Sequence, residues 1–228
     1  MNNFDSGAVT FIDVLGWKGI WARKNSQSPI EKLKRIVENV NVEIQSIITS
    51  LIDRVPELHG LDAKSVSILN ISDTIVIITK GDAVATICLH GEISKRILTD
   101  GLLSELPMRG ATSYGEFSHE DLTFMGPAVD EAAAWHEVTN WVGIILTPSA
   151  LLKLKTPKES WISYQKVPYK SADIRIGKSL VLNWAAEWSK RGKQADDFRE
   201  ISYLAGPLLP EVGKYYLNAL DFLEEVTT

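Results

Sequence analysis

Apolar and polar residues follow two different periods along this chain, and these periods divide it into predicted strands and helices. Apolar residues at every third or fourth position indicate amphipathic helices, whereas short runs rich in β-branched residues indicate strands. The predicted strands cover residues 8–13, 65–71, 74–79, 108–117 and 142–147. The predicted helices cover residues 28–55, 82–101, 127–138 and 210–226.

The order of these elements predicts the fold class. Strand, long helix, hairpin, helix and strand form the βαββαβ pattern of a ferredoxin-like α/β (α+β) fold, an antiparallel sheet with helices on one face. Residues 1–150 are therefore expected to form one domain. From about Pro148 onward the chain becomes rich in Lys, Pro, Ser and Trp. We expect residues 151–228 to be a C-terminal extension that packs on the core or on a partner subunit.

Composition and charge narrow the function classes. The chain has 228 residues, of which 45% are hydrophobic and 23% charged, as in an ordinary soluble protein. Its net charge of −5 argues against a nucleic-acid surface, so an anionic small ligand would need a metal or a few placed cations. No apolar run is long enough for a membrane span, the start does not resemble a signal peptide, and Cys88 is the single cysteine. We expect a cytoplasmic protein that binds neither nucleic acid nor membrane, with Cys88 in the core.

The first strand ends in an acid and a glycine, Asp13 and Gly16, within AVTFIDVLGWKGIW. Asp13 has the position of a helix cap, and Asp73 at the hairpin tip has the position of a turn residue. In a βαββαβ sheet, however, the first strand lies beside the hairpin, so the two carboxylates would meet there. Facing carboxylates favour a cation between them, and oxygen ligands suit Mg²⁺ or Mn²⁺. Gly16 would let the backbone from Val14 to Trp17 approach a triphosphate.

The four histidines show no metal-ligand spacing. His59, His90, His119 and His136 are scattered along the chain, and we expect each to be a surface or capping residue.

At these motifs the chain resembles the class III nucleotidyl cyclases, over about residues 8–147. FIDVLGW is similar to the family's first metal-binding strand and phosphate loop, and NISDTIVI is similar to its second metal-binding hairpin. LPMRGATSYGE resembles the strand whose arginine contacts the triphosphate, and FMGPAVDEAAAWHE resembles the segment that follows. The resemblance implies two divalent ions, Mn²⁺ or Mg²⁺, and a homodimer with the substrate between subunits.

The resemblance also implies roles for individual residues. The implied metal ligands are Asp13, the Val14 carbonyl and Asp73. The implied contacts to the triphosphate are the Gly16 and Trp17 amides and Arg109, although Arg109 has a structural salt bridge as its alternative role. Phe11, Asn70, Thr123 and Asp130 complete the implied substrate pocket.

The chain departs from the family at informative positions. Gly126 is kept, but Asp130 stands at the family's asparagine and Ala134 at its transition-state arginine. Leu69 and Thr123 occupy the positions of the two purine-reading residues. A pocket without purine readers most resembles the bacterial pyrimidine cyclases of the Pycsar anti-phage system. The expected activity is cyclisation of UTP.

Three alternatives to a uridylate cyclase stay open. One is a cytidylate cyclase. Another is a catalytically inactive nucleotide-binding regulatory module, which Ala134 favours. A polymerase-like or dinucleotide cyclase would share the topology, but the GGDEF-type signature of the latter is absent from the sequence.

Overall fold

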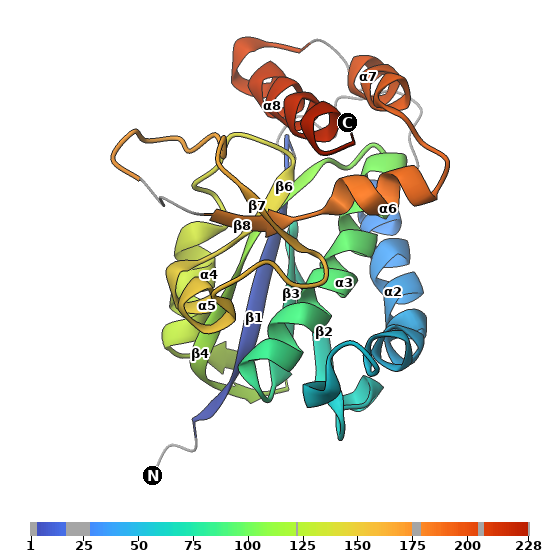
Figure 1. The fold of residues 1–228 in the computed structure, drawn as a ribbon. Coiled ribbons are helices and arrows are strands. Elements are labelled where there is room, and N and C mark those ends of the chain that lie inside the picture. Colours follow the sequence, from blue (N-terminus) through green and yellow to red (C-terminus); the bar gives the residue numbers. More distant parts are fainter. Residues whose placement is uncertain (1–3, 17–27, 122, 175–178, 205–207, 228) are drawn as a thin grey trace.

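A single mixed sheet organises the molecule in the computed structural model, which describes residues 4–16, 28–121, 123–174, 179–204 and 208–227 (Figure 1). Its strands follow the order β2-β3-β1-β4-β6-β8-β7, and β5 pairs with β4. The strands are β1 (Asp5–Val14), β2 (Val66–Ile71), β3 (Thr74–Lys80), β4 (Met108–Glu120), β5 (Thr123–Met125), β6 (Gly143–Leu146), β7 (Trp161–Tyr164) and β8 (Ser179–Leu182). The α-helices are α2 (Pro29–Leu51), α3 (Ala83–Leu103), α4 (Pro127–Trp135), α5 (Pro148–Leu154), α6 (Trp184–Lys190), α7 (Ala195–Leu204) and α8 (Pro210–Thr227).

The predicted βαββαβ order is confirmed, with β1 at the centre of its four strands. β1 is antiparallel to both β3 and β4, and β2 is antiparallel to β3. The only departure from an antiparallel sheet among the described ladders is β6, which runs parallel to β4. The end of β1 therefore lies between the hairpin that joins β2 to β3 and the start of β4.

Successive residues of β1 face opposite sides of the sheet, and each side has its own apolar core. Ile12 belongs to the larger core, which the buried faces of α2 and α3 cover. Val9 belongs to a smaller core with Val129 and Ala132 of α4. The two helices of the βαββαβ unit thus share one face, and α4 packs on the other. Asp13 has the same parity as Val9, so it lies on the α4 face.

The C-terminal third continues the same sheet. β8 pairs with β6 and with β7, both antiparallel. Trp161, Trp184 and Trp188 are fully buried. Phe222 of α8 packs against Trp184, with ring centroids 5.8 Å apart. In Figure 1, α8 lies across the upper end of the sheet, the end at which β1 finishes.

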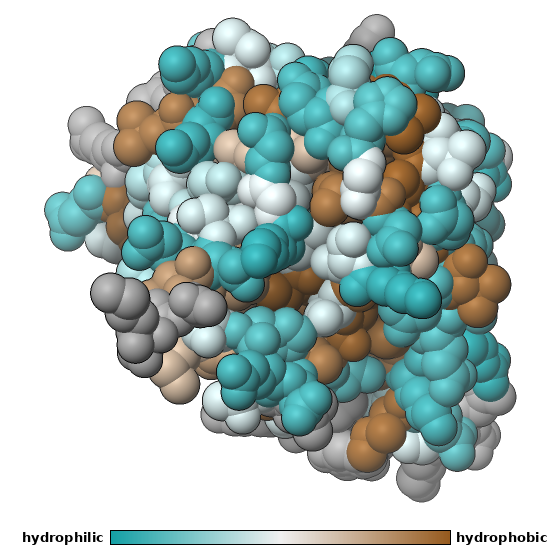
Figure 2. Space-filling view, turned by 90° about the horizontal axis from the view of Figure 1, so that it is seen from below, coloured by the Kyte–Doolittle hydropathy of each residue, from teal (hydrophilic) through white to brown (hydrophobic). Residues whose placement is uncertain are grey.

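The opposite end of the molecule, where β1 begins, has a mixed surface. Figure 2 shows hydrophilic side chains spread over this face, with apolar side chains in separate groups between them. Within the described part of the chain, no helix is long and apolar enough to cross a membrane.

Candidate functional site at the end of β1

Asp13 and Arg109 lie directly opposite each other on β1 and β4. Arg109 Nη2 is 3.4 Å from Asp13 Oδ2, which is long for a charge-assisted hydrogen bond. Both side chains are nearly buried, with exposed fractions of 13% for Asp13 and 7% for Arg109. Asp13 precedes the last residue of β1 and points over the covered sheet face, so its side chain is not that of an exposed strand end.

The hairpin between β2 and β3 brings Asp73 beside Asp13. The Val14 amide donates a hydrogen bond to the Asp73 carbonyl at 3.1 Å, and Asp13 pairs with Thr74 in the ladder. A two-residue hairpin needs a positive φ in its turn, and Ser72 supplies it with a φ of 58° in place of a glycine. Strand register thus places the two acids on adjoining segments.

The electrostatics of Asp13 distinguish this site from an ordinary salt bridge. Burial raises the pKa of the Asp13 carboxyl above its usual value. The Arg109 charge opposes this rise, whereas the neighbouring charge of Asp73 adds to it. A carboxylate whose pKa stays raised beside an arginine is incompletely compensated. This balance favours a ligand site over a purely structural pair.

Arg109 is held from several sides by residues of other elements. Its Nη1 donates to the Thr139 carbonyl at 3.2 Å, and its Nη2 lies 3.7 Å from Glu137 Oε2. The Tyr215 ring lies against the guanidinium, with 5.5 Å from Cζ to the ring centroid. The buried Arg109 Nε has no hydrogen-bond partner among the described residues.

A divalent cation fits the donor set at this end of β1. Asp13 and Asp73 lie on adjoining segments there, and Asp13 is nearly buried with a pKa raised above its usual value. No group of three or more His, Cys, Asp or Glu residues within the described ranges is arranged to hold a metal. Mg²⁺ usually keeps several waters and binds through one or two carboxylates together with substrate phosphates. Asp13 and Asp73 therefore suit a cation that arrives with a phosphate ligand.

The sequence analysis missed five residues that surround this site. His136 and Glu137 follow α4, Lys170 lies between β7 and β8, and Lys214 and Tyr215 belong to α8. An antiparallel β-bridge pairs Thr139 with Tyr169 and so places Lys170, the next residue, near the site. No local motif marks these residues, because separate segments far apart in the sequence bring them together.

The remaining predicted residues lie at varying distance from this pair of acids. Gly16 is exposed in the turn after β1, where its φ of 74° explains the glycine. Phe11 lies between Phe124 and His136, with ring centroids 6.1 Å and 5.8 Å away. Asn70, Thr123 and Asp130 are exposed on β2, β5 and α4. Their hydrogen bonds do not link them to Asp13 within the described residues, and Trp17 lies outside those residues.

One histidine contradicts the sequence-based expectation. His90 is fully buried in α3, where its Nδ1 lies 2.8 Å from the Thr10 hydroxyl. The Thr10 hydroxyl also lies 2.7 Å from that of Thr112. Burial lowers the pKa of His90 to about 3, so the ring is neutral at physiological pH. The expectation of a surface or capping histidine failed because α3 turns this residue toward the sheet.

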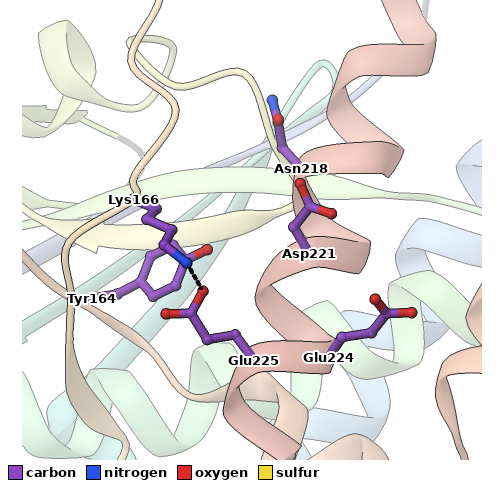
Figure 3. A pocket seen from close by; sticks show the side chains of 6 residues that line it. All are labelled: Tyr164, Lys166, Asn218, Asp221, Glu224 and Glu225. Carbon is purple, nitrogen blue, oxygen red and sulfur yellow. Dashed lines mark hydrogen bonds and ion pairs between the residues drawn. The ribbon is translucent and has the colours of Figure 1, made fainter.

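A separate cavity of about 460 Å³ lies along α8 (Figure 3). Its lining residues are Tyr164, Lys166, Asn218, Asp221, Glu224 and Glu225. Lys166 points to Glu225, and Nζ lies 2.6 Å from Oε2. The cavity is acidic. At the opposite end of the same helix, by contrast, Lys214 and Arg109 both lie near the Tyr215 ring.

Comparison with known proteins gives distant structural likenesses only. No family model and no curated protein matches the chain. The catalytic core of a rhodopsin-guanylyl cyclase with converted specificity, in complex with ATPalphaS, is 13% identical over 78% of this chain and 96% of that chain, with a TM-score of 0.47. The monomeric guanylyl cyclase domain of the RhoGC fusion protein from the aquatic fungus Blastocladiella emersonii is 14% identical over 78% and 95%, with a TM-score of 0.45. The adenylate/guanylate cyclase/hydrolase from Silicibacter pomeroyi is 14% identical over 78% and 95%, with a TM-score of 0.44.

Proposed function

We propose that this chain is a nucleotidyl cyclase that converts a pyrimidine nucleoside triphosphate, preferably UTP, to its 3′,5′-cyclic monophosphate and pyrophosphate. The observation that carries the proposal is the meeting of Asp13, Asp73 and Arg109 at one end of β1. Two acids and a nearly buried arginine are the groups that bind a cation and a polyphosphate. The resemblance to the Pycsar enzymes extends the proposal to second-messenger synthesis in anti-phage defence.

Asp13 and Asp73 would hold Mn²⁺ or Mg²⁺, and Val14 would offer its carbonyl oxygen. When bound, such ions lower the pKa of a hydroxyl and neutralise charge on phosphate oxygens. The protein orients the triphosphate so that the ribose 3′-hydroxyl faces the α-phosphorus. The 3′-hydroxyl oxygen loses its proton to water and forms the new bond to the α-phosphorus, the bond from that phosphorus to the bridging oxygen breaks, and pyrophosphate leaves with the electron pair of this bond.

Arg109 stabilises the charge that grows on the departing pyrophosphate. Its nearly complete burial suits this role, because an arginine held away from water binds phosphate more strongly. Ala134 is exposed on α4 and provides no second cation. Lys170, which lies beside Glu137 with 3.9 Å between Nζ and Oε2, is the residue that we propose in its place.

The pyrimidine preference rests on the residues at the two purine-reading positions. Leu69 is partly buried against Val9 and its apolar neighbours, and Thr123 is a small, exposed hydroxyl. Adenine would leave its exocyclic amine unpaired, which costs about 1–3 kcal/mol. Uracil presents two acceptors and one donor, which suit side chains such as Asn70 and Thr123. Asp130 could accept from the amino group of cytosine, so CTP is the competing substrate.

The deciding experiment incubates the purified chain with equal concentrations of the four nucleoside triphosphates and Mn²⁺, followed by chromatography of the products. We expect cyclic UMP as the main product. Cyclic CMP would overturn only the uracil preference, and cyclic AMP or cyclic GMP would overturn the pyrimidine assignment. Binding of triphosphate without any product would favour the inactive regulatory module, the alternative that Ala134 supports.

The proposal includes a homodimer with the substrate between subunits. Specific activity should then fall on dilution below the dimer dissociation constant, and a monomer that stays fully active would refute the dimer. Asp13 and Arg109 pair within one chain. Mixing an Asp13→Ala chain with an Arg109→Ala chain should therefore give no rescue of activity, and partial rescue would place the two residues in one site from different subunits.

A further inference from the structure

The first half of α8 lies over the arginine of the candidate site. The Tyr215 ring centroid is 5.5 Å from Arg109 Cζ and 5.4 Å from Lys214 Nζ. A cation at this distance from an aromatic face is attracted by the ring, and the attraction grows as the cation loses water. With 7% of its side chain exposed, Arg109 is nearly dehydrated, whereas Lys214 is exposed.

The position of Tyr215 is fixed by the packing of α8 on the core. Asn218 Nδ2 donates to the Asn140 carbonyl at 2.6 Å, next to the Thr139 carbonyl that accepts from Arg109. Farther along the helix, Phe222 is fully buried, and its ring lies 5.2 Å from that of Trp141. These contacts hold α8 to the segment beside Arg109. The helix therefore forms one side of the site.

Positively charged side chains from separate parts of the chain lie near this side of the site. The Lys170 amide donates to the Val138 carbonyl at 2.8 Å, which fixes its backbone near Glu137. Burial lowers the pKa of Lys170, and the positive charges of Arg109 and Lys214 lower it further, against the opposing charge of Glu137. Lys214 is therefore within electrostatic reach of Lys170, and it lies against the same Tyr215 ring as Arg109.

The charges at this end of β1 are unusual for the whole protein. The chain carries a net charge of −5, yet Arg109 and Lys170 lie within electrostatic reach of Asp13, Lys214 lies within reach of Lys170, and Glu137 stands among them. Like charges are placed together at a cost, which an anionic ligand removes. A group with several negative charges, such as a triphosphate, matches this arrangement better than a single phosphate does.

We propose that α8 completes the polyphosphate side of the Asp13 site, with Tyr215 as a positioning residue for Arg109 and Lys214 as a further cation for the triphosphate. This inference rests on the proposed function for its substrate class, and it assigns part of the site to the C-terminal third. Tyr215 acts through Arg109: its ring keeps the guanidinium plane fixed, which preserves donor geometry for phosphate oxygens.

The test measures binding of inorganic tripolyphosphate in Mn²⁺ by titration calorimetry, so that it requires no turnover. Tyr215→Leu removes the ring and should weaken binding about 3- to 30-fold. Tyr215→Phe keeps the ring and should stay close to the wild-type affinity. Tyr203→Leu, at an exposed tyrosine of α7, is the matched control and should change nothing.

The second variant is Lys214→Met, which keeps the length of an exposed side chain. We expect about a 2- to 5-fold loss of affinity for tripolyphosphate and a smaller loss for inorganic phosphate. The matched control is Lys166→Met, at the exposed lysine of the acidic cavity that pairs with Glu225 of α8. Thermal unfolding of each variant separates a loss of binding from a loss of folded protein.

Each outcome decides the inference separately from the proposed function. Wild-type affinity in both Tyr215→Leu and Lys214→Met, or no binding of tripolyphosphate by the wild type, overturns the inference. An equal loss in Tyr215→Phe and Tyr215→Leu overturns the positioning by the ring. Weakened binding in the variants, together with no cyclic nucleotide from the wild type, supports the inference and refutes the proposed cyclase.

Discussion

β1 carries polar side chains on both faces of the sheet. On one face they are neutral and hydrogen-bonded to one another, and on the other they are charged. On the α3 face, Thr10 joins His90 and Thr112 in a chain of neutral hydrogen bonds, and all three side chains are fully buried. On the α4 face, Asp13 meets Arg109 with a long contact and a raised pKa. Three positions along one strand separate a neutral core network, in which only the buried His90 Nε2 lacks a partner among the described residues, from an incompletely compensated charged site.

The difference between the two faces lies in the free-energy cost of burying neutral and charged groups. Buried neutral groups that bond to one another cost little and specify a unique packing. Buried charges cost more, and a site that leaves them incompletely paired needs a ligand to compensate them. We therefore expect changes on the α3 face to alter stability, whereas changes on the α4 face alter binding and turnover.

The largest effect should follow removal of the acids on the α4 face. Asp13→Ala and Asp73→Ala should each lower cyclic nucleotide production by at least about 100-fold, because each removes a proposed metal ligand. Asp5→Ala, at the other end of β1, where Asp5 pairs with Lys80, is the control and should keep activity. Circular dichroism verifies the fold, and near wild-type turnover of either variant with Mn²⁺ would refute the metal assignment.

The next effect concerns the neutral histidine of the α3 face. The folded pKa of His90 is about 3 and its unfolded value is 6.5, so the unfolded chain binds the extra proton between these values. Stability should therefore fall on acidification below pH 6.5, by about 1.4 kcal/mol for each pH unit, until pH 3. Urea unfolding at pH 7, 6 and 5 measures the slope.

Two variants isolate the contribution of His90 to this slope. His90→Asn keeps a hydrogen-bonding side chain but cannot titrate, so its slope should be flatter by the same amount. His59→Asn changes an exposed histidine and should leave the slope as it is. An unchanged slope in His90→Asn would show that His90 does not account for the acid sensitivity.

The sequence predicted the α4 face of this comparison better than the α3 face. The neighbouring positions of Asp13 and Asp73 could be predicted because each stands at a strand end, and the βαββαβ order fixes which strands adjoin. His90 was misplaced because its partners, Thr10 and Thr112, look like ordinary strand residues until register sets them opposite each other. A register is set by the packing of the whole sheet, which no single segment reveals.

The C-terminal third was the least predictable part. Its helix α8 was predicted correctly, since apolar residues recur there at helical spacing. The short strands β7 and β8 and the helices α5, α6 and α7 were missed, because segments of four to ten residues carry too little periodicity. The contacts of Lys170 and Tyr215 with Arg109 and its neighbours depend on these short elements, so they were beyond reach of the sequence.

A smaller effect should follow removal of one hydroxyl from the α3 face. Thr10→Val keeps the β-branched shape and leaves the buried His90 and Thr112 without their shared partner, which costs about 1–3 kcal/mol of stability. Turnover of the folded enzyme should not change. Thr49→Val removes an exposed hydroxyl of α2 as the control and should stay within about 0.5 kcal/mol of the wild type. An equal loss in both variants would contradict the role of the buried network.

The smallest effect is a gain of stability on the α4 face. Burial raises the pKa of Asp13, so at neutral pH the folded state carries an ionised carboxylate that the unfolded chain holds at lower cost. This penalty is absent below the unfolded pKa, grows as the pH rises toward the folded pKa and is constant above it. Asp13→Asn removes the charge and should raise stability at pH 7 when a chelator is present.

Added Mn²⁺ should reverse the order of stability of the wild type and Asp13→Asn. The cation should raise the melting temperature of the wild type, since it binds the folded carboxylates, and should raise that of Asp13→Asn less. Thermal unfolding with a chelator and with excess Mn²⁺ measures both terms in the same two samples. A less stable Asp13→Asn under chelation would mean that the Arg109 pair outweighs the burial of Asp13, and the contrast between the two faces would then be lost.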